Sequence, residues 1–364
     1  MKQKIVPELE FKANFRDILP RHRAMQTAQA GCLIYTSLEE EKSLIAAESA
    51  KIPPLEAIDF DRDPLLISRL FCDRAENLLS FRRDYPDDSI PYASPRYGSG
   101  ILAGMLLGEL TFGGNTSWVE PVGGSLDAVI GFKWGGENKW IDIVIDGLDY
   151  LSGRMQGKCY TFLEGYHAPL ELASMLRGGE LYLDMSLEPE KVHQLLRRSD
   201  EALMWLYQLI EQRVPDPNYG ALATVLWMER GLPYLSDDSA GLISPAHYLE
   251  FGVPYTDKMF ERYGGGFLHF HTKAYHQRDN LSAMQWLTIH NWRQDPNTRE
   301  PYEVLDHILP GAKHQIVMIE LSPEHIRKNI DLLAQGRFVI MTTCEDRREQ
   351  HEIVELIREK TPPT

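Results

Sequence analysis

The sequence predicts an α/β protein, a (β/α)8 TIM barrel with an N-terminal helical extension. From about Ile90 onward, short apolar runs alternate with longer segments of helical period, which is typical of parallel strands joined by crossover helices. Eight runs qualify as strands, and eight strands close such a barrel. They are Ile90–Ser94, Ser117–Pro121, Cys159–Leu163, Leu232–Leu235, Phe267–Phe270, Leu287–Asn291, Ile316–Ile319 and Phe338–Met341.

Helix signals fall between these runs. Ser322-Pro323-Glu324 combines an N-cap, a first-turn proline and an acid, and Gly336 supplies the stop. Ser244-Pro245 opens another helix in the same way, and Pro254 is expected to kink it. The segment from Glu188 to about residue 214 has leucines at helical spacing, which predicts a helix that packs on the barrel.

The N-terminal region does not follow the strand–helix alternation. Residues 1–85 are predicted as helices that form an extension packed on the barrel, and residues 86–364 as the barrel itself. The long segment Gly123–Gly157 is expected to include a hairpin or loop over the barrel mouth.

Composition excludes several classes of function. Hydrophobic residues make up 43% of the 364 residues, and no apolar run approaches the length needed to cross a bilayer. The first residues lack the apolar segment of a secretory signal, so a cytoplasmic protein is expected, and four cysteines without CxxC spacing indicate free thiols. The net charge of -15 argues against a nucleic-acid partner.

The run Phe267-Leu268-His269-Phe270-His271 places two histidines with one residue between them at the end of a predicted strand. Residues i and i+2 of a strand point to the same face, so the two imidazoles are expected side by side. Cys344 follows the last predicted strand and offers a thiolate. Together these residues suit a catalytic Zn²⁺ ion with one open position. The alternative is that both histidines are hydrogen-bonded core residues.

Other polar and aromatic residues fall at the same predicted mouth of the barrel, where such folds place their active sites. Carboxylates and imidazoles there suit acid–base work, although strand-end carboxylates also cap helices or pair with arginines, and core packing explains the aromatic residues equally well. The predicted catalytic residues are Asp237, Asp238, Glu164 and His290, and the predicted substrate-binding residues are Tyr97, Trp118, Tyr166, Glu120, His276 and Asp295.

Several segments, in order, resemble the uroporphyrinogen decarboxylase superfamily. They are Gly165-Tyr166-His167-Ala168-Pro169 with the helix after it, Pro189-Glu190-Lys191-Val192, and Asp237-Asp238-Ser239-Ala240-Gly241 continuing to Ser244-Pro245. The resemblance covers roughly the last three quarters of the chain. It implies a TIM barrel and places a functional acid at Asp237 or Asp238.

Within that superfamily the chain is most similar to the zinc-dependent methyltransferases that work with methylated corrinoids. In those enzymes the fifth strand ends in His-x-Cys and the eighth in a cysteine, and these residues bind zinc. The corresponding positions here are His269, His271 and Cys344. The resemblance therefore implies Zn²⁺, methylcobalamin or another corrinoid as co-substrate, free or on a corrinoid protein, a small-molecule acceptor and a homodimer.

Two alternatives remain open. One is a decarboxylase or other lyase that acts on a carboxylated small molecule, and the other is a non-catalytic barrel that only binds a ligand. Uroporphyrinogen itself is not expected as a substrate, because the arginine-rich N-terminal loop, the first-strand aspartate and the Gly-His-Gly turn of the decarboxylases are not evident here.

Overall fold

The computed structural model describes residues 8–163, 166–212, 221–223, 226–228 and 232–364. Its centre is a six-stranded sheet in which every pair of neighbouring strands is parallel. The strands follow one another in the order β1 (Gly31–Leu38), β12 (Arg337–Cys344), β11 (Ile316–Glu320), β10 (Leu287–Arg293), β9 (Gly266–His271) and β8 (Tyr234–Ser236).

Two further parallel strands, β2 (Tyr92–Ala93) and β5 (Tyr160–Thr161), pair with each other. Backbone hydrogen bonds link their flanking segments to both edges of the larger sheet. The Asp88 amide donates to the Ile34 carbonyl over 2.8 Å, and the Ala168 amide donates to the Ser236 carbonyl over 2.9 Å. The arrangement is a mixed α/β, barrel-like fold, although the strands of the described residues do not join into one closed sheet.

The N-terminal region contains helices, as expected, but also a strand that the sequence analysis missed. Between α1 (Phe15–Thr27) and α2 (Glu39–Ser49), all eight residues of β1 pair with β12. Six of its eight residues are buried, as expected of a parallel strand that is covered on both faces. Residues 1–85 are therefore not purely helical.

The predicted strand Ser117–Pro121 is also corrected. Its first residues belong to β4 (Thr116–Trp118), which pairs antiparallel with β3 (Thr111–Gly113) in a short hairpin. Gly114 in the turn has φ +62°, a conformation that favours glycine and suits a tight hairpin. Hairpin strands of this kind lie outside a parallel ladder.

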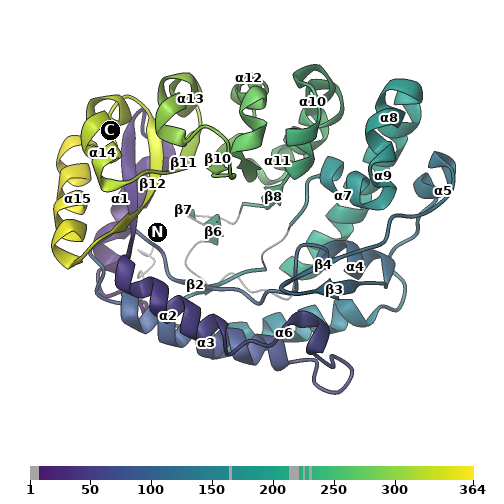
Figure 1. Cartoon of the computed structure of the whole chain (residues 1–364), viewed down its shortest axis with the longest axis horizontal. Helices are drawn as coiled ribbons and strands as arrows, with labels where there is room; N and C mark the ends of the chain where they lie inside the picture. The colour runs from purple at the N-terminus through teal and green to yellow at the C-terminus, as the bar shows by residue number, and fades with distance from the viewer. Residues whose placement is uncertain (1–7, 164–165, 213–220, 224–225, 229–231) are drawn as a thin grey trace, which may run out of the picture.

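Helices lie outside the strands (Figure 1). Ser322 and Ser244 cap α14 and α10 through their hydroxyls, as predicted. The helix expected to bend at Pro254 is divided at Gly252 into α10 and α11. The helices not yet given are α3 (Leu66–Arg82), α4 (Ile101–Leu107), α5 (Leu126–Ile130), α6 (Lys139–Met155), α7 (Pro169–Arg177), α8 (Glu180–Leu187), α9 (Pro189–Glu211), α10 (Pro245–Phe251), α11 (Val253–Tyr263), α12 (Arg278–Ala283), α13 (Leu305–Ala312), α14 (Pro323–Leu333) and α15 (Arg347–Lys360).

The remaining short elements connect these parts. Strands β6 (Ala221–Ala223) and β7 (Leu226–Met228) form an antiparallel pair, and 3-10 turns occur at η1 (Leu55–Ala57), η2 (Asp238–Leu242), η3 (Thr272–Gln277) and η4 (Pro301–Val304). Within the part of the chain that the structure describes, no helix is both long and apolar enough to span a membrane.

Alternate residues of the large sheet pack into two separate cores. On one face, Leu33, Phe267, Ile289, Ile316 and Val339 form a small cluster. On the other face, side chains from the same strands join the large cluster that includes the surrounding helices. The first face is the interior of the strand layer, and its residues at the carboxyl ends of the strands line the cavities described below.

Candidate metal centre

Asp238, His269 and His271 come together where β8 and β9 end. His269 and His271 share the interior face with Phe267, since side chains two residues apart on a strand point the same way. Asp238 follows β8 at the start of η2 and accepts a hydrogen bond from the Ser236 hydroxyl over 3.3 Å. One ligand atom from each of the three lies within 4.8 Å of the others.

The distances fit metal coordination. The two Nε2 atoms of His269 and His271 are 3.2 Å apart, and the His271 Nε2 is 3.7 Å from Asp238 Oδ1. Two nitrogens bound to a tetrahedral zinc at ~2.0–2.1 Å are separated by roughly 3.3 Å. The imidazole pair therefore needs almost no movement to hold such an ion.

His271 is oriented by a second carboxylate. Its Nδ1 donates to Asp295 Oδ1 over 3.0 Å, and Asp295 also accepts from the Lys273 amide over 3.2 Å. A proton on Nδ1 leaves Nε2 of the neutral ring with a lone pair directed at the cluster. Carboxylate–histidine pairs of this kind fix the ring of a metal ligand and raise its basicity.

Burial keeps His269 neutral. It lowers the pKa of His269 to about 4, and the nearby charge of Asp238 opposes that effect only in part. The Nε2 atoms of the two imidazoles lie beside Asp238, and these three side chains form a set of donors that a divalent cation satisfies. Two histidines and one carboxylate are a known ligand set for catalytic zinc with an open fourth position.

Cys344, predicted as the third ligand, is not part of this cluster, and the correction has a simple cause. It lies at the end of β12 in register with Leu38 and packs against Leu38 and Tyr85. Met341, Thr342 and Thr343 line the cavity, whereas Cys344, the next residue along β12, lies in the cluster with Leu38 and Tyr85. Burial raises the pKa of its thiol to about 12. Asp238 is the acidic side chain that lies beside the two histidines instead.

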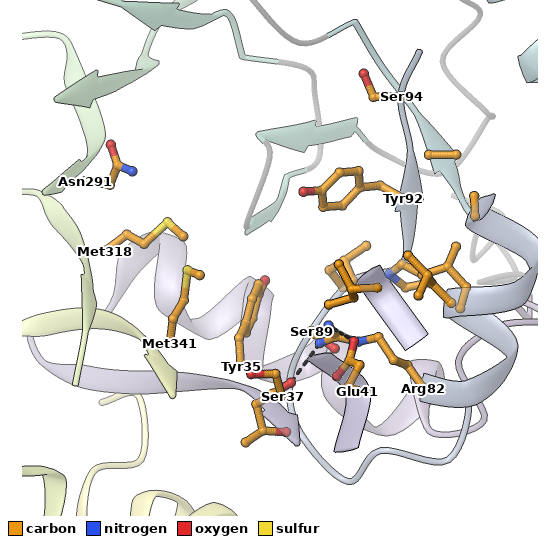
Figure 2. A pocket seen from close by; sticks show the side chains of 18 of the residues that line it. Tyr35, Ser37, Glu41, Arg82, Ser89, Tyr92, Ser94, Asn291, Met318 and Met341 are labelled. Carbon is orange, nitrogen blue, oxygen red and sulfur yellow. Dashed lines mark hydrogen bonds and ion pairs between the residues drawn. The ribbon is translucent and has the colours of Figure 1, made fainter. Parts of the chain in front are cut away.

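Two cavities meet at the cluster. The first, about 720 Å³, is lined by both histidines and by residues of β1, β10, β11 and β12. Figure 2 shows Tyr35, Asn291, Met318 and Met341 around this space. The second, about 510 Å³, is lined by Asp238 and His269 together with residues of the β2–α4 and β5–α7 connections. The cluster thus borders both cavities.

The first cavity carries more positive than negative side chains. Its charged lining consists of five cationic residues, Lys12, Arg74, Arg82, Arg96 and Arg293, and two acids, Glu41 and Glu320. Three of the cations are paired: Arg82 contacts Glu41 at 3.1 Å, as Figure 2 shows, Arg293 contacts Glu320 at 3.6 Å, and Lys12 contacts Asp87, which lies behind the lining, at 2.5 Å. This excess in a chain of net charge -15 favours a ligand with negative charge.

Several predicted residues lie at or near the cluster in roles that the structure specifies. Asp238 and Asp295 are the carboxylates described above, and Tyr97 lines the second cavity with its hydroxyl 3.1 Å from that of Ser68. Asp237 is fully buried and lines neither cavity. Burial, with Glu171 nearby, raises the pKa of Asp237 well above its ordinary value.

Other predicted residues lie apart from the cluster. His290 packs against Trp292 on the helix-facing side of β10 and lines neither cavity. Among the rest, Glu120 accepts from the Trp118 indole over 2.9 Å on the hairpin, Tyr166 packs on Tyr207, and His276 is held by the Lys273 and Ile243 carbonyls. Neither cavity is lined by Trp118, Glu120, Tyr166 or His276. Glu164 lies outside the described residues.

Three residues that line the second cavity, His167, Arg74 and Arg96, are absent from the predicted site, and the two arginines also line the first cavity. His167 stands in the segment Gly165-Tyr166-His167, beyond the predicted third strand, and Arg74 lies within α3. Neither residue lies at the end of a predicted strand, which was the signal used to predict site residues. Pairing of the His167 backbone with Ser236 of β8 is what brings that histidine to the mouth.

Comparisons with known proteins identify a fold. No protein-family model matches the chain. No curated protein matches it either. Among solved structures, it is similar to a methyltransferase from Methanosarcina mazei, with a TM-score of 0.57 and 13% sequence identity over 94% of this chain and 98% of that chain. The chain therefore has a methyltransferase-like fold.

Proposed function

We propose that this chain is a zinc-dependent methyltransferase of the uroporphyrinogen decarboxylase superfamily that moves a methyl group between a corrinoid and a small-molecule acceptor. The observation that carries the proposal is the convergence of Asp238, His269 and His271 at the border of two cavities. The similar fold of a methyltransferase supports it. The same proposal includes a closed (β/α)8 barrel built from the two parallel sheets.

The residues of the cluster divide the work. His269 and His271 would hold Zn²⁺ through their Nε2 atoms, and Asp238 would supply the negative charge. Asp295 keeps a proton on Nδ1 of His271, so that the Nε2 lone pair stays directed at the ion. When bound, zinc lowers the pKa of an acceptor group in its open position, which makes that group a better nucleophile.

The first cavity is the proposed place of approach for the methyl donor. Its apolar wall includes Met318 and Met341, and its cationic side chains attract negatively charged groups. Both histidines reach its surface. A donor in this space would therefore lie beside the nucleophile without displacing the ligands.

A lyase that acts on a carboxylated molecule is a second candidate. The excess of arginines in the first cavity favours it, because a guanidinium binds a carboxylate through two parallel hydrogen bonds. Demethylation of methylcobalamin by the purified protein distinguishes the two functions.

The test compares metal content and methylcobalamin turnover in the wild type, Asp238→Ala and Cys344→Ala. We expect one zinc per wild-type chain, and loss of both zinc and turnover in Asp238→Ala, because two neutral imidazoles alone bind a dication weakly. Cys344→Ala is the matched control and should keep both. Iron in place of zinc, or full turnover in Asp238→Ala, would refute the proposal.

A further inference from the structure

The second cavity approaches the cluster from a different side than the first. Both cavities include His269, Phe71, Tyr234 and the two arginines Arg74 and Arg96, so they adjoin one another. His271 lines only the first cavity, and Asp238 lines only the second. At about 510 Å³ the second cavity is within the range of small-molecule sites. A two-substrate reaction at one metal needs such an arrangement, since donor and acceptor must reach the same point without occupying the same space.

His167 is a polar group in this cavity that the protein leaves unsatisfied. Its side chain is buried, with 3% of the residue exposed. Neither ring nitrogen has a partner at full hydrogen-bond geometry, and the Ser99 backbone is the nearest polar group that acts on the ring. Burying a polar group without a hydrogen bond is unfavourable, and such groups in native structures call for an explanation. A ligand in the cavity would supply the missing partner.

The backbone holds His167 in place. Its amide donates to the Tyr207 hydroxyl over 3.0 Å, and that hydroxyl donates to the His167 carbonyl over 2.7 Å. A parallel bridge to Ser236 ties the same residue to β8. The imidazole is therefore pre-positioned, as a recognition group must be if binding is not to require reordering of the site. Burial lowers the pKa of His167 to about 4, so the ring is neutral near pH 7.

The charged lining of the second cavity indicates the ligand. Its cationic residues are Arg74 and Arg96, and each guanidinium has five N–H donors, enough to serve a ligand as well as a protein neighbour. Of its two acids, Glu171 accepts two hydrogen bonds from Ser239, at 2.8 and 2.7 Å, and Asp238 belongs to the metal cluster. Both acids have partners or a role, and both arginines have protein neighbours as well. An anion is favoured because each guanidinium has more N–H donors than one neighbour uses.

We propose that the second cavity binds a small carboxylate-bearing methyl acceptor, with its carboxylate on Arg74 and Arg96, a hydrogen bond to His167, and its reactive end at the Asp238–His269 edge of the cluster. The presence of the metal and the role of the ligand as a methyl acceptor rest on the proposed function. Binding of the carboxylate and the contact with His167 stand on the cavity alone. His167 is here a residue for positioning and specificity.

The experiment titrates zinc-loaded protein with 3-mercaptopropionate by isothermal calorimetry. Its thiol suits zinc and its carboxylate suits the arginines. 3-Mercapto-1-propanol, which has no charge, should bind at least tenfold more weakly, because a charge-assisted hydrogen bond is lost. His167→Leu should weaken binding of the acid about tenfold through the lost hydrogen bond.

His290→Leu is the matched control variant. His290 is also buried, at 4% exposed, and neither of its ring nitrogens has a partner, but it lines neither cavity. We expect it to bind the acid as the wild type does. Circular dichroism of both variants verifies that they are folded, so that a loss of binding in His167→Leu alone reports on the cavity.

Three results would overturn the inference: no binding of the acid to the wild type, equal affinity for acid and alcohol, or equal affinity of the wild type and His167→Leu. The proposed function fails separately. If the protein takes up no zinc or does not turn over methylcobalamin, titration of the metal-free protein with propionate still tests the cavity. Binding of propionate that falls in His167→Leu and persists in His290→Leu would then support the inference.

Discussion

Asp295 is expected to set the zinc affinity of the site although it does not touch the ion. Replacing it with asparagine keeps an oxygen acceptor for His271 Nδ1 but removes the negative charge, and replacing it with alanine leaves Nδ1 without this partner. The Asp295 side chain is 14% exposed, so solvent screens its interaction with His271 only weakly. The two substitutions thus remove the interaction in steps.

The magnitude follows from the contact. Loss of a partner that orients a metal-bound histidine typically lowers metal affinity 10–100-fold, which is about 1.4–2.7 kcal/mol. Asp295→Asn should lower the zinc affinity about 10-fold, because the amide oxygen still accepts the hydrogen bond. Asp295→Ala belongs near the upper figure, because the His271 ring then loses both its acceptor and the orientation that the acceptor imposes.

Competition with a chromophoric zinc chelator at pH 7.5 measures these affinities. Asp257→Asn is the matched control, since Asp257 accepts from the Gln285 and Trp286 amides just before β10 begins, at the opposite end of that strand from Asp295. Its affinity for zinc should equal that of the wild type. Unchanged affinity in both Asp295 variants would refute the orienting role and weaken the case for His271 as a ligand.

Two further predictions concern stability. Burial lowers the pKa of His22 and His290 to about 4 from 6.5, so the unfolded chain takes up protons below pH 6.5 that the folded chain refuses. The free energy of unfolding by urea should therefore fall as pH drops from 6.5 to 4, by up to about 3 kcal/mol for each imidazole, and His290→Leu should flatten that slope. Lys12→Met breaks a buried pair with Asp87 at 2.5 Å and should cost about 3–5 kcal/mol, whereas Arg16→Met, in an exposed pair, should change stability by less than about 1 kcal/mol. A Lys12→Met protein as stable as the wild type would contradict the first of these two figures.

Local patterns predicted the parts of the fold that depend on local physics. At the N-caps Ser322 and Ser244, the side-chain hydroxyl accepts a hydrogen bond from the backbone amide three residues later, so a short segment contains the whole interaction. The helix break near Pro254 is local in the same sense. Strand β1 is different, because what makes Gly31–Leu38 a strand is its pairing with β12, about 300 residues away. No local pattern within Gly31–Leu38 indicates that this segment pairs with β12.

It was harder to predict toward which side of the sheet each strand-end side chain points. That His269 and His271 share a face follows from their spacing and needs no knowledge of where the strand begins. Which of Asp237 and Asp238, or of Thr343 and Cys344, faces the cavity depends on phase, and an error of one residue reverses the answer. The structure turns Asp238 and Thr343 to cavities and buries Asp237 and Cys344 behind them.

The ligand set also explains where substrate has room. Asp238, His269 and His271 come from the ends of β8 and β9, which are neighbours in the sheet and therefore about 5 Å apart. A set with Cys344 would have required a metal between β9 and β12, across the space that the first cavity occupies. With the metal ligands confined to β8 and β9, the ends of β10, β11, β12 and β1 are left to line that cavity. A carboxylate in place of a thiolate keeps one negative charge on the proposed metal but offers a harder oxygen donor, and it would place the ion at one wall, where both cavities reach it.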